Sequence, residues 1–304
     1  MDGDLGFYTV KPDQMQLVNP LLILTFIPLF ELIFYPLLSL IGIRRPLQKL
    51  TMGGIFAGIA FLCSMFVEIT LEKTYPIIPQ PGEAQVRIFN GLNCDYKINV
   101  NLPTEYSLDL GPNSYFVERH IALKDDKLSS RFTLTSPTCA NIDETFELKS
   151  EKASSYFLTG TAQAPVVQPY EDDPEKSKKG TPLIRVLANL ITGGTVFFRD
   201  KDGTHYNQTY DSRNLTDIPS NIHDIYVNDS VVKTHEFRLG GVYTVLIQET
   251  ASGVYVKTHF DEFMSTQSNL SLQSTDIIVI SEPNTMNMLW LLPQYIIMTL
   301  GEVK

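Results

Sequence analysis

The sequence lacks the short motifs that mark most enzyme active sites. It contains no Gly-x-Ser-x-Gly elbow and no glycine-rich phosphate-binding loop, and its five histidines do not have the spacing of metal ligands. Two carboxylate pairs, Asp125-Asp126 and Asp172-Asp173, occur in polar stretches that are typical of solvated turns. We therefore expect that the protein is not an enzyme and has neither a metal site nor a cofactor.

An excess of positive charge is also missing. The chain has 24 lysine and arginine residues against 34 aspartates and glutamates, which gives a formal net charge of −10. This balance argues against nucleic acid as a partner, because binding to phosphates relies on clustered positive charge. It is compatible with cationic ligands such as basic peptides or a secreted protease.

Cysteine is scarce, with three residues in the whole chain. Cys63 lies among apolar neighbours, which is typical of a small buried hydrophobic side chain. Cys94 and Cys139 lie in a polar part of the sequence, where an oxidising compartment would let them form one disulfide. Two separate thiols are the alternative.

Long apolar stretches, by contrast, are present. Residues 17–43 and 50–71 each contain one charged side chain, and each reaches the ~20 residues that cross a bilayer as a helix. The first stretch lacks the basic flank and the cleavage site of a signal peptide. We expect two transmembrane helices.

The charges around these stretches predict their orientation. Residues 44–49 carry three positive charges and no negative one, which places this loop in the cytoplasm. The N-terminal segment 1–16 and the long segment 72–283 then lie outside the cell. N-glycosylation requires that side of the membrane. The predicted outside location of residues 72–283 agrees with four acceptor motifs in this segment, at Asn207, Asn214, Asn228 and Asn269.

The outer segment consists of short runs of alternating apolar and polar residues, which favour antiparallel β-sandwiches. We expect one module at 83–164 and a second at 182–281, joined by a proline-rich, charged linker at 165–181. The opening strands of the two modules resemble each other at an offset of 98 residues. This weak repeat favours two immunoglobulin-like modules in tandem, although two opening strands can also be alike by chance.

The membrane stretches have features that a passive anchor does not need. Three prolines recur every eight residues in the first stretch, and each frees a backbone carbonyl that a neighbouring helix must satisfy. Glu31 lies near its middle, where a carboxylate serves either a helix–helix hydrogen bond or an ion or substrate pathway. The second stretch contains Gly54-x-x-x-Gly58 with Gly53 and Ala57 beside it, a small-residue stripe for close helix packing.

The closing run, residues 286–304, is apolar but short. About 15 helical residues rise roughly 22 Å, less than the ~30 Å thickness of the hydrocarbon layer. We therefore expect the start of a truncated transmembrane helix. Pro293 lies near its beginning and Glu302 near its end.

Four short motifs lie in and around the apolar stretches. They are Asp13-Gln-Met-Gln-x-Val-Asn-Pro20, Phe30-Glu-x-x-x-Tyr-Pro36, Leu47-x-Lys-Leu-x-x-Gly53 and Pro293-Gln-Tyr-x-x-x-Thr-x-Gly-Glu-Val303. Together they resemble animal proton-coupled oligopeptide transporters, a family of the major facilitator superfamily. The resemblance implies that residues 17–43 and 50–71 correspond to helices eight and nine, and that residues 286–304 begin helix ten. It also implies two extracellular immunoglobulin-like modules between helices nine and ten.

The resemblance implies uptake of di- and tripeptides across the plasma membrane, with protons as the coupling ion. Asn19 and Glu302 occupy the positions that hold the amino group of the peptide, and Pro293 occupies a bending point. An ammonium group leaving water needs a carboxylate and a neutral acceptor, which these two side chains supply. Because the other transporter helices are missing from this sequence, we expect no transport by the chain alone.

A different class of function stays open. The chain also fits a membrane-anchored adhesion or binding protein that acts through its two outer modules. The three prolines, Glu31 and the Gly-Glu-Val ending speak against this alternative, because a passive anchor has no use for them.

Overall fold

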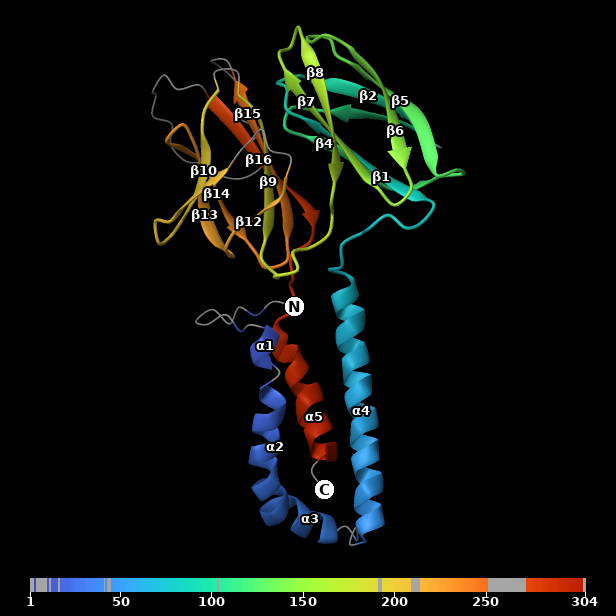
Figure 1. Cartoon of the computed structure of the whole chain (residues 1–304), viewed down its shortest axis with the longest axis vertical. Coiled ribbons are helices and arrows are strands. Elements are labelled where there is room, and N and C mark those ends of the chain that lie inside the picture. Colours follow the sequence, from blue (N-terminus) through green and yellow to red (C-terminus); the bar gives the residue numbers. More distant parts are fainter. Residues whose placement is uncertain are drawn as a thin grey trace. The chain divides into compact units, whose positions relative to one another are not determined.

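In the computed structural model, the chain divides into two compact units, a helical unit of Met1–Tyr75 with Asn284–Lys304 and a β unit of Pro76–Pro283. Figure 1 shows the elements of both. The structure describes residues 3, 10, 12–15, 17–40, 42, 45–102, 104–190, 193–208, 214–250 and 272–302.

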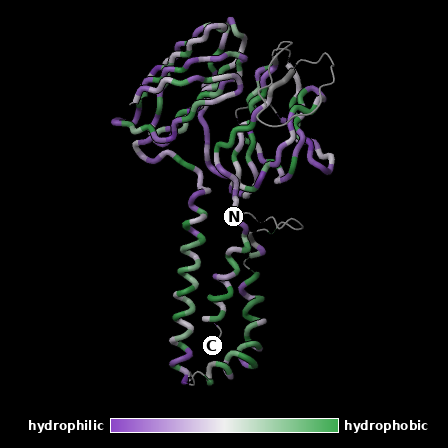
Figure 2. Tube along the Cα trace, turned by 180° about the vertical axis from the view of Figure 1, so that it is seen from behind, coloured by the Kyte–Doolittle hydropathy of each residue, from purple (hydrophilic) through white to green (hydrophobic). Residues whose placement is uncertain are grey.

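The helical unit combines segments from both ends of the chain. Within the described residues, two helices, Val18–Leu37 and Pro46–Glu72, are long and apolar enough to cross a membrane. Figure 2 shows the apolar residues along them in green. The elements are α1 (Pro12–Met15), α2 (Val18–Leu29), the π-helical η1 (Phe30–Phe34), α3 (Tyr35–Leu40), α4 (Pro46–Glu72), the 3-10 helix η2 (Met288–Leu291) and α5 (Leu292–Glu302).

Proline placement explains two details of these helices. The π-helical turn η1 lies between Pro28 and Pro36, where missing backbone donors favour a wider hydrogen-bond register. Helix α4 begins at Pro46, a residue type whose missing N–H costs nothing in the first turn. The side chain of Gln48 accepts a hydrogen bond from the backbone N–H of Arg45 at 3.2 Å. Most of the predicted cytoplasmic loop 44–49 is therefore the first turn of α4, which corrects that boundary.

Helix α5 packs against both α2 and α4 (Figure 1). The closest approach joins two glycines, because a Cβ atom on Gly301 would lie 2.9 Å from the carbonyl oxygen of Gly53. Gly54 and Gly58 have open space where a Cβ atom would lie. The predicted small-residue stripe of α4 therefore contacts α5 through Gly53 and Ala57, and not through Gly54 and Gly58.

The β unit contains two modules, and each consists of two four-stranded sheets. Strand pairing puts alternate residues of each strand into a core between the sheets. Module 1 contains β1 (Glu83–Asn90), β2 (Tyr96–Asn101), β3 (Glu105–Leu110), β4 (Tyr115–Ala122), β5 (Lys127–Thr135), β6 (Ile142–Lys149), β7 (Ala153–Gly160) and β8 (Pro165–Asp172). Module 2 contains β9 (Leu183–Asn189), β10 (Val196–Asp200), β11 (His205–Gln208), β12 (Thr216–Asp217), β13 (Asn221–Val227), β14 (Ser230–Phe237), β15 (Val242–Thr250) and β16 (Leu272–Ser281).

The two modules repeat one topology. The sheet order β4-β1-β7-β8 of module 1 corresponds to β12-β9-β15-β16 of module 2, and β3-β2-β5-β6 corresponds to β11-β10-β13-β14. Strands β1 and β9 each have one antiparallel and one parallel neighbour. These are the strands that carry the sequence similarity, so the repeat reflects a repeated fold. A mostly-β region with four sheets is confirmed, whereas the immunoglobulin-like assignment stays a prediction.

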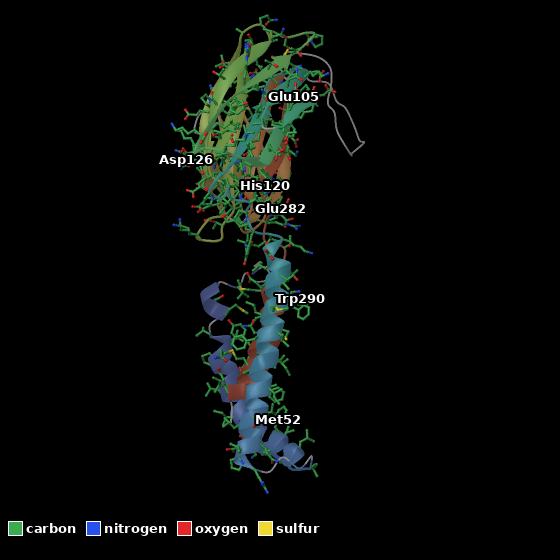
Figure 3. The ribbon with its side chains drawn as sticks, turned by 90° about the vertical axis from the view of Figure 1, so that its right-hand side faces the viewer. Met52, Glu105, His120, Asp126, Glu282 and Trp290 are labelled. Atoms are coloured by element: carbon green, nitrogen blue, oxygen red, sulfur yellow. A yellow bond between two sulfur atoms is a disulfide. The ribbon has the colours of Figure 1, made fainter. Side chains whose placement is uncertain are left out.

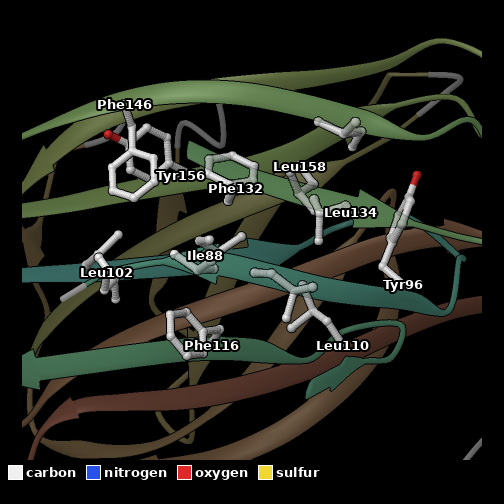
Figure 4. Close-up of a cluster of buried hydrophobic side chains, with 14 of the residues drawn as sticks. Ile88, Tyr96, Leu102, Leu110, Phe116, Phe132, Leu134, Phe146, Tyr156 and Leu158 are labelled. Carbon is white, nitrogen blue, oxygen red and sulfur yellow. The ribbon is translucent and has the colours of Figure 1, made fainter. Parts of the chain in front are cut away.

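Each module has its own core. In module 1, three aromatic rings lie between the sheets at centroid distances of 5.6–5.7 Å (Figure 4). They belong to Phe132, Phe146 and Tyr156. Cys94 and Cys139 form a disulfide beside this core. Module 2 is filled in the same way around Phe198 and Phe237.

The predicted linker 165–181 is too long by eight residues. Residues Pro165–Asp172 form β8, which pairs with β7 along its whole length. Proline is tolerated there because β8 is an edge strand, where a missing N–H costs no ladder hydrogen bond. The connection between the modules therefore starts only after Asp172.

The carboxylate pairs singled out from the sequence have opposite environments. Asp125 and Asp126 are exposed in the turn before β5, as expected (Figure 3). Asp172, in contrast, is completely buried between the modules and forms ion pairs with Arg87 at 2.8 Å and Arg185 at 2.6 Å. The expectation of a solvated turn was wrong for Asp172, because β8 carries this residue into the junction.

Candidate functional site

The candidate site lies in the helical unit where α2 and α5 meet. Asn19 is half-buried in the first turn of α2. Its Oδ1 atom lies 2.9 Å from Oγ1 of Thr299, a residue of α5 that is fully buried. This contact joins two segments that are 280 residues apart in sequence. The structure therefore brings one predicted substrate-binding residue against the helix that contains the other.

Thr299 was not selected from the sequence. Its hydroxyl oxygen also lies 2.7 Å from the carbonyl oxygen of Tyr295, four residues earlier on the same helix. Threonine commonly makes this bond in helices. The available signal was its place in the motif that ends in Gly-Glu-Val, three residues before Glu302. That spacing puts both side chains on one face of α5.

Glu302 is the last residue of α5, and its side chain is exposed in the helical unit. Thr299, one turn earlier, is buried against α2. Along α5, the buried contact of Thr299 with Asn19 is thus followed one turn later by an exposed carboxylate. A carboxylate and a neutral amide are suitable acceptors for an ammonium group.

Glu31 occupies a different position. It lies in the π-helical turn η1 and is exposed, whereas its neighbour Phe30 is buried and stacks on Phe34 at 4.8 Å. The π-helical turn thus directs Phe30 into the helical unit and Glu31 away from it. Such turns occur frequently at functional sites.

Pro293 is the second residue of α5, directly after the 3-10 helix η2. Asn287 caps η2 by accepting a hydrogen bond from the N–H of Leu289 at 2.9 Å. The change from 3-10 to α-helical geometry, not a kink inside α5, is the irregularity at this point. A hinge at Pro293 remains a prediction.

The predicted glycosylation sites lie in module 2. Asn207, in β11, and Asn214 are exposed. Asn228 is exposed too, in the hairpin between β13 and β14, and its Oδ1 atom accepts a hydrogen bond from the N–H of Thr195 at 3.0 Å. Asn269 lies outside the described residues.

Comparison with known proteins gives matches to transporters. The model of the POT family (PTR2) matches residues 1–146. Peptide transporter family 1 of Drosophila melanogaster is 31% identical over 314 residues, covering 100% of this chain and 39% of the relative. Human solute carrier family 15 member 1 is 26% identical over 317 residues, covering 100% of this chain and 40% of the relative.

A nematode protein extends the pattern. Peptide transporter family 2 of Caenorhabditis elegans is 26% identical over 362 residues, covering 100% of this chain and 45% of the relative. The chain therefore spans about two fifths of the length of the curated relatives it matches. The matches include the residues of α2 and α5 that meet at Asn19 and Thr299.

Proposed function

We propose that this chain is part of a POT-family transporter, and that its helical unit contributes to the peptide-binding site of a symporter that imports di- and tripeptides with protons. In this proposal α2, α4 and α5 are membrane helices, and further helices of a complete transporter surround them. The β unit is an extracellular region of the same protein at the plasma membrane.

The contact between Asn19 and Thr299 is the observation that supports this function best. It holds α2 and α5 together, so the amide of Asn19 lies on the side of α5 that continues to Glu302. A peptide ammonium bound here would exchange water for one carboxylate and one amide oxygen. Charge-assisted hydrogen bonds of this kind are among the strongest in proteins.

Proton coupling requires a carboxylate that gains and loses a proton during transport. We propose Glu302 for this role, because it is the carboxylate that the resemblance places at the amino group of the peptide. Glu31 is the second candidate, since its exposed side chain in η1 is free to face another helix.

The β unit has no catalytic role in this proposal. Its position outside the cell is supported by the exposed sequon asparagines and by the Cys94–Cys139 disulfide, a bond that persists in oxidising compartments. The acidic composition of the chain favours cationic ligands, so basic peptides or a secreted protease are candidate partners for this unit.

A chimera tests the transport function. Residues 1–304 would replace the matching segment of the Drosophila relative, and dipeptide uptake by expressing cells would be measured with and without an inward proton gradient. We expect proton-dependent uptake that Asn19→Ala and Glu302→Gln each reduce at least tenfold, since each removes an ammonium acceptor. Biotinylation of surface protein controls for expression. Normal surface levels without uptake would refute the proposal.

A further inference from the structure

We propose that Thr299 is a positioning residue that turns the amide of Asn19, so that Oδ1 faces the bound peptide ammonium and Nδ2 faces Thr299. This inference rests on the proposed peptide transport. It assigns Thr299 a role in substrate affinity beyond helix packing, and it concerns which end of one amide is presented to the substrate.

The hydroxyl group of Thr299 has a single proton. Oγ1 of Thr299 has two oxygen neighbours, the carbonyl oxygen of Tyr295 at 2.7 Å and Oδ1 of Asn19 at 2.9 Å. Both neighbours are acceptors, and a threonine hydroxyl donates only one hydrogen bond. With the amide in this orientation, one of the two short contacts has no proton between its oxygens.

A half-turn of the Asn19 amide satisfies both contacts. Nδ2 then takes the place of Oδ1 at the same distance and donates to Oγ1 of Thr299, while the threonine proton goes to Tyr295. The two ends of an amide have nearly the same shape, and the hydrogen-bond network around them decides their orientation. The backbone carbonyl of Tyr295 can only accept, so it fixes the direction of the whole chain of hydrogen bonds.

The surroundings of Thr299 keep this arrangement in place. The side chain is fully buried. Two residues further on, a Cβ atom on Gly301 would lie 2.9 Å from the carbonyl oxygen of Gly53, so α5 packs closely on α4 there. Two oxygen atoms 2.9 Å apart without a proton between them repel each other, so the orientation that pairs Nδ2 of Asn19 with Oγ1 of Thr299 is favoured.

The orientation matters for a cationic ligand. A peptide ammonium has donors only and needs an acceptor, so Oδ1 of Asn19 attracts it whereas the Nδ2 amino group repels it. Thr299 would therefore decide whether the amide of Asn19 attracts or repels the ammonium group of the substrate. Glu302 supplies the negative charge regardless of this choice.

The test uses Thr299→Val, which removes the hydroxyl at nearly constant shape, in the chimera described above. We expect KM for a dipeptide to rise about three- to tenfold with kcat nearly unchanged, because a freely rotating amide loses the net value of one oriented hydrogen bond. Thr299→Ser keeps the hydroxyl and should restore the wild-type KM. An N-acetylated dipeptide, which has no ammonium, should inhibit wild type and Thr299→Val equally.

Thr25→Val is the matched control. The Thr25 hydroxyl also donates to a carbonyl four residues earlier, that of Leu21 at 2.9 Å, but it lies on an exposed face of α2. We expect this variant to keep the wild-type KM. A normal or lowered KM in Thr299→Val would overturn the role of Thr299 alone. Inhibition by the N-acetylated peptide that weakens in this variant by the same factor as the KM of the dipeptide rises would overturn it too. Absence of uptake by the wild-type chimera would overturn the proposed function and this inference together.

Discussion

Arg87 and Arg185 occupy matching positions in the two modules, 98 residues apart, and both bind the carboxylate of Asp172. Nη1 of Arg87 lies 2.8 Å from Oδ2 of Asp172, and Nη2 of Arg185 lies 2.6 Å from Oδ1. A repeated sequence thus supplies two cations, and one strand supplies the single anion between them. The Ser155 hydroxyl donates a further hydrogen bond to Oδ2 at 3.0 Å.

Replacing Asp172 by asparagine should destabilise the β unit strongly. The variant leaves two buried arginines without their counter-charge, and breaking a buried ion pair typically costs about 3–5 kcal/mol. Chemical denaturation of the β unit, followed by far-ultraviolet circular dichroism, measures the loss of stability. Asp126→Asn, at an exposed turn, is the control and should change the free energy of unfolding little. Equal stability of the two variants would contradict the structural role of Asp172.

The same ion pairs predict how stability depends on pH. Burial by itself raises the pKa of the Asp172 carboxyl, but Arg185 and Arg87 outweigh it and hold this pKa below its ordinary value. A lowered pKa in the folded state stabilises the fold above the unfolded pKa of about 3.9, and this contribution is lost as the pH falls further. We expect the stability difference between wild type and Asp172→Asn to be constant from pH 7 to about pH 5 and to shrink below about pH 4. Denaturation midpoints of both proteins across this range provide the measurement.

The disulfide of module 1 should contribute to stability by restricting the unfolded chain. It links Cys94 and Cys139 across a separation of 45 residues. Closing a loop of this size is worth about 4 kcal/mol in the chain-entropy model. Cys94→Ala with Cys139→Ala should lower the free energy of unfolding of module 1 by about 2–4 kcal/mol. Cys63→Ala, in α4, should leave the β unit unchanged, and a comparable loss in that variant would argue against the assignment.

Helix packing in the helical unit depends on Gly301. A methyl group there would approach the carbonyl oxygen of Gly53 to 2.9 Å, so Gly301→Ala should push α5 away from α4. We expect a loss of about 1–3 kcal/mol, typical of overpacked sites. Thermal unfolding of the full chain in detergent would show it. Gly54→Ala adds the same methyl group in open space and serves as the control, so equal melting of both variants would disprove the close contact.

Local patterns in the sequence were sufficient for the elements and for much of the topology. Apolar length predicted α2 and α4, alternation predicted the strands, and the offset of 98 residues predicted the repeated fold. Each of these signals is a periodicity within one segment or a likeness between two segments. The motifs around Asn19 and Glu302 also predicted the family, because they are contiguous in sequence.

Tertiary structure alone decided which residues meet. Nothing near Asp172 in the sequence distinguishes it from Asp125 or Asp126, and only its place at the end of β8 buries it between two arginines. In the same way, only the packing of α5 selects Gly53 over Gly54 and brings Thr299 to Asn19. The reason is physical: periodicity shows which face of an element is apolar, whereas the partner on that face depends on residues far away in the chain.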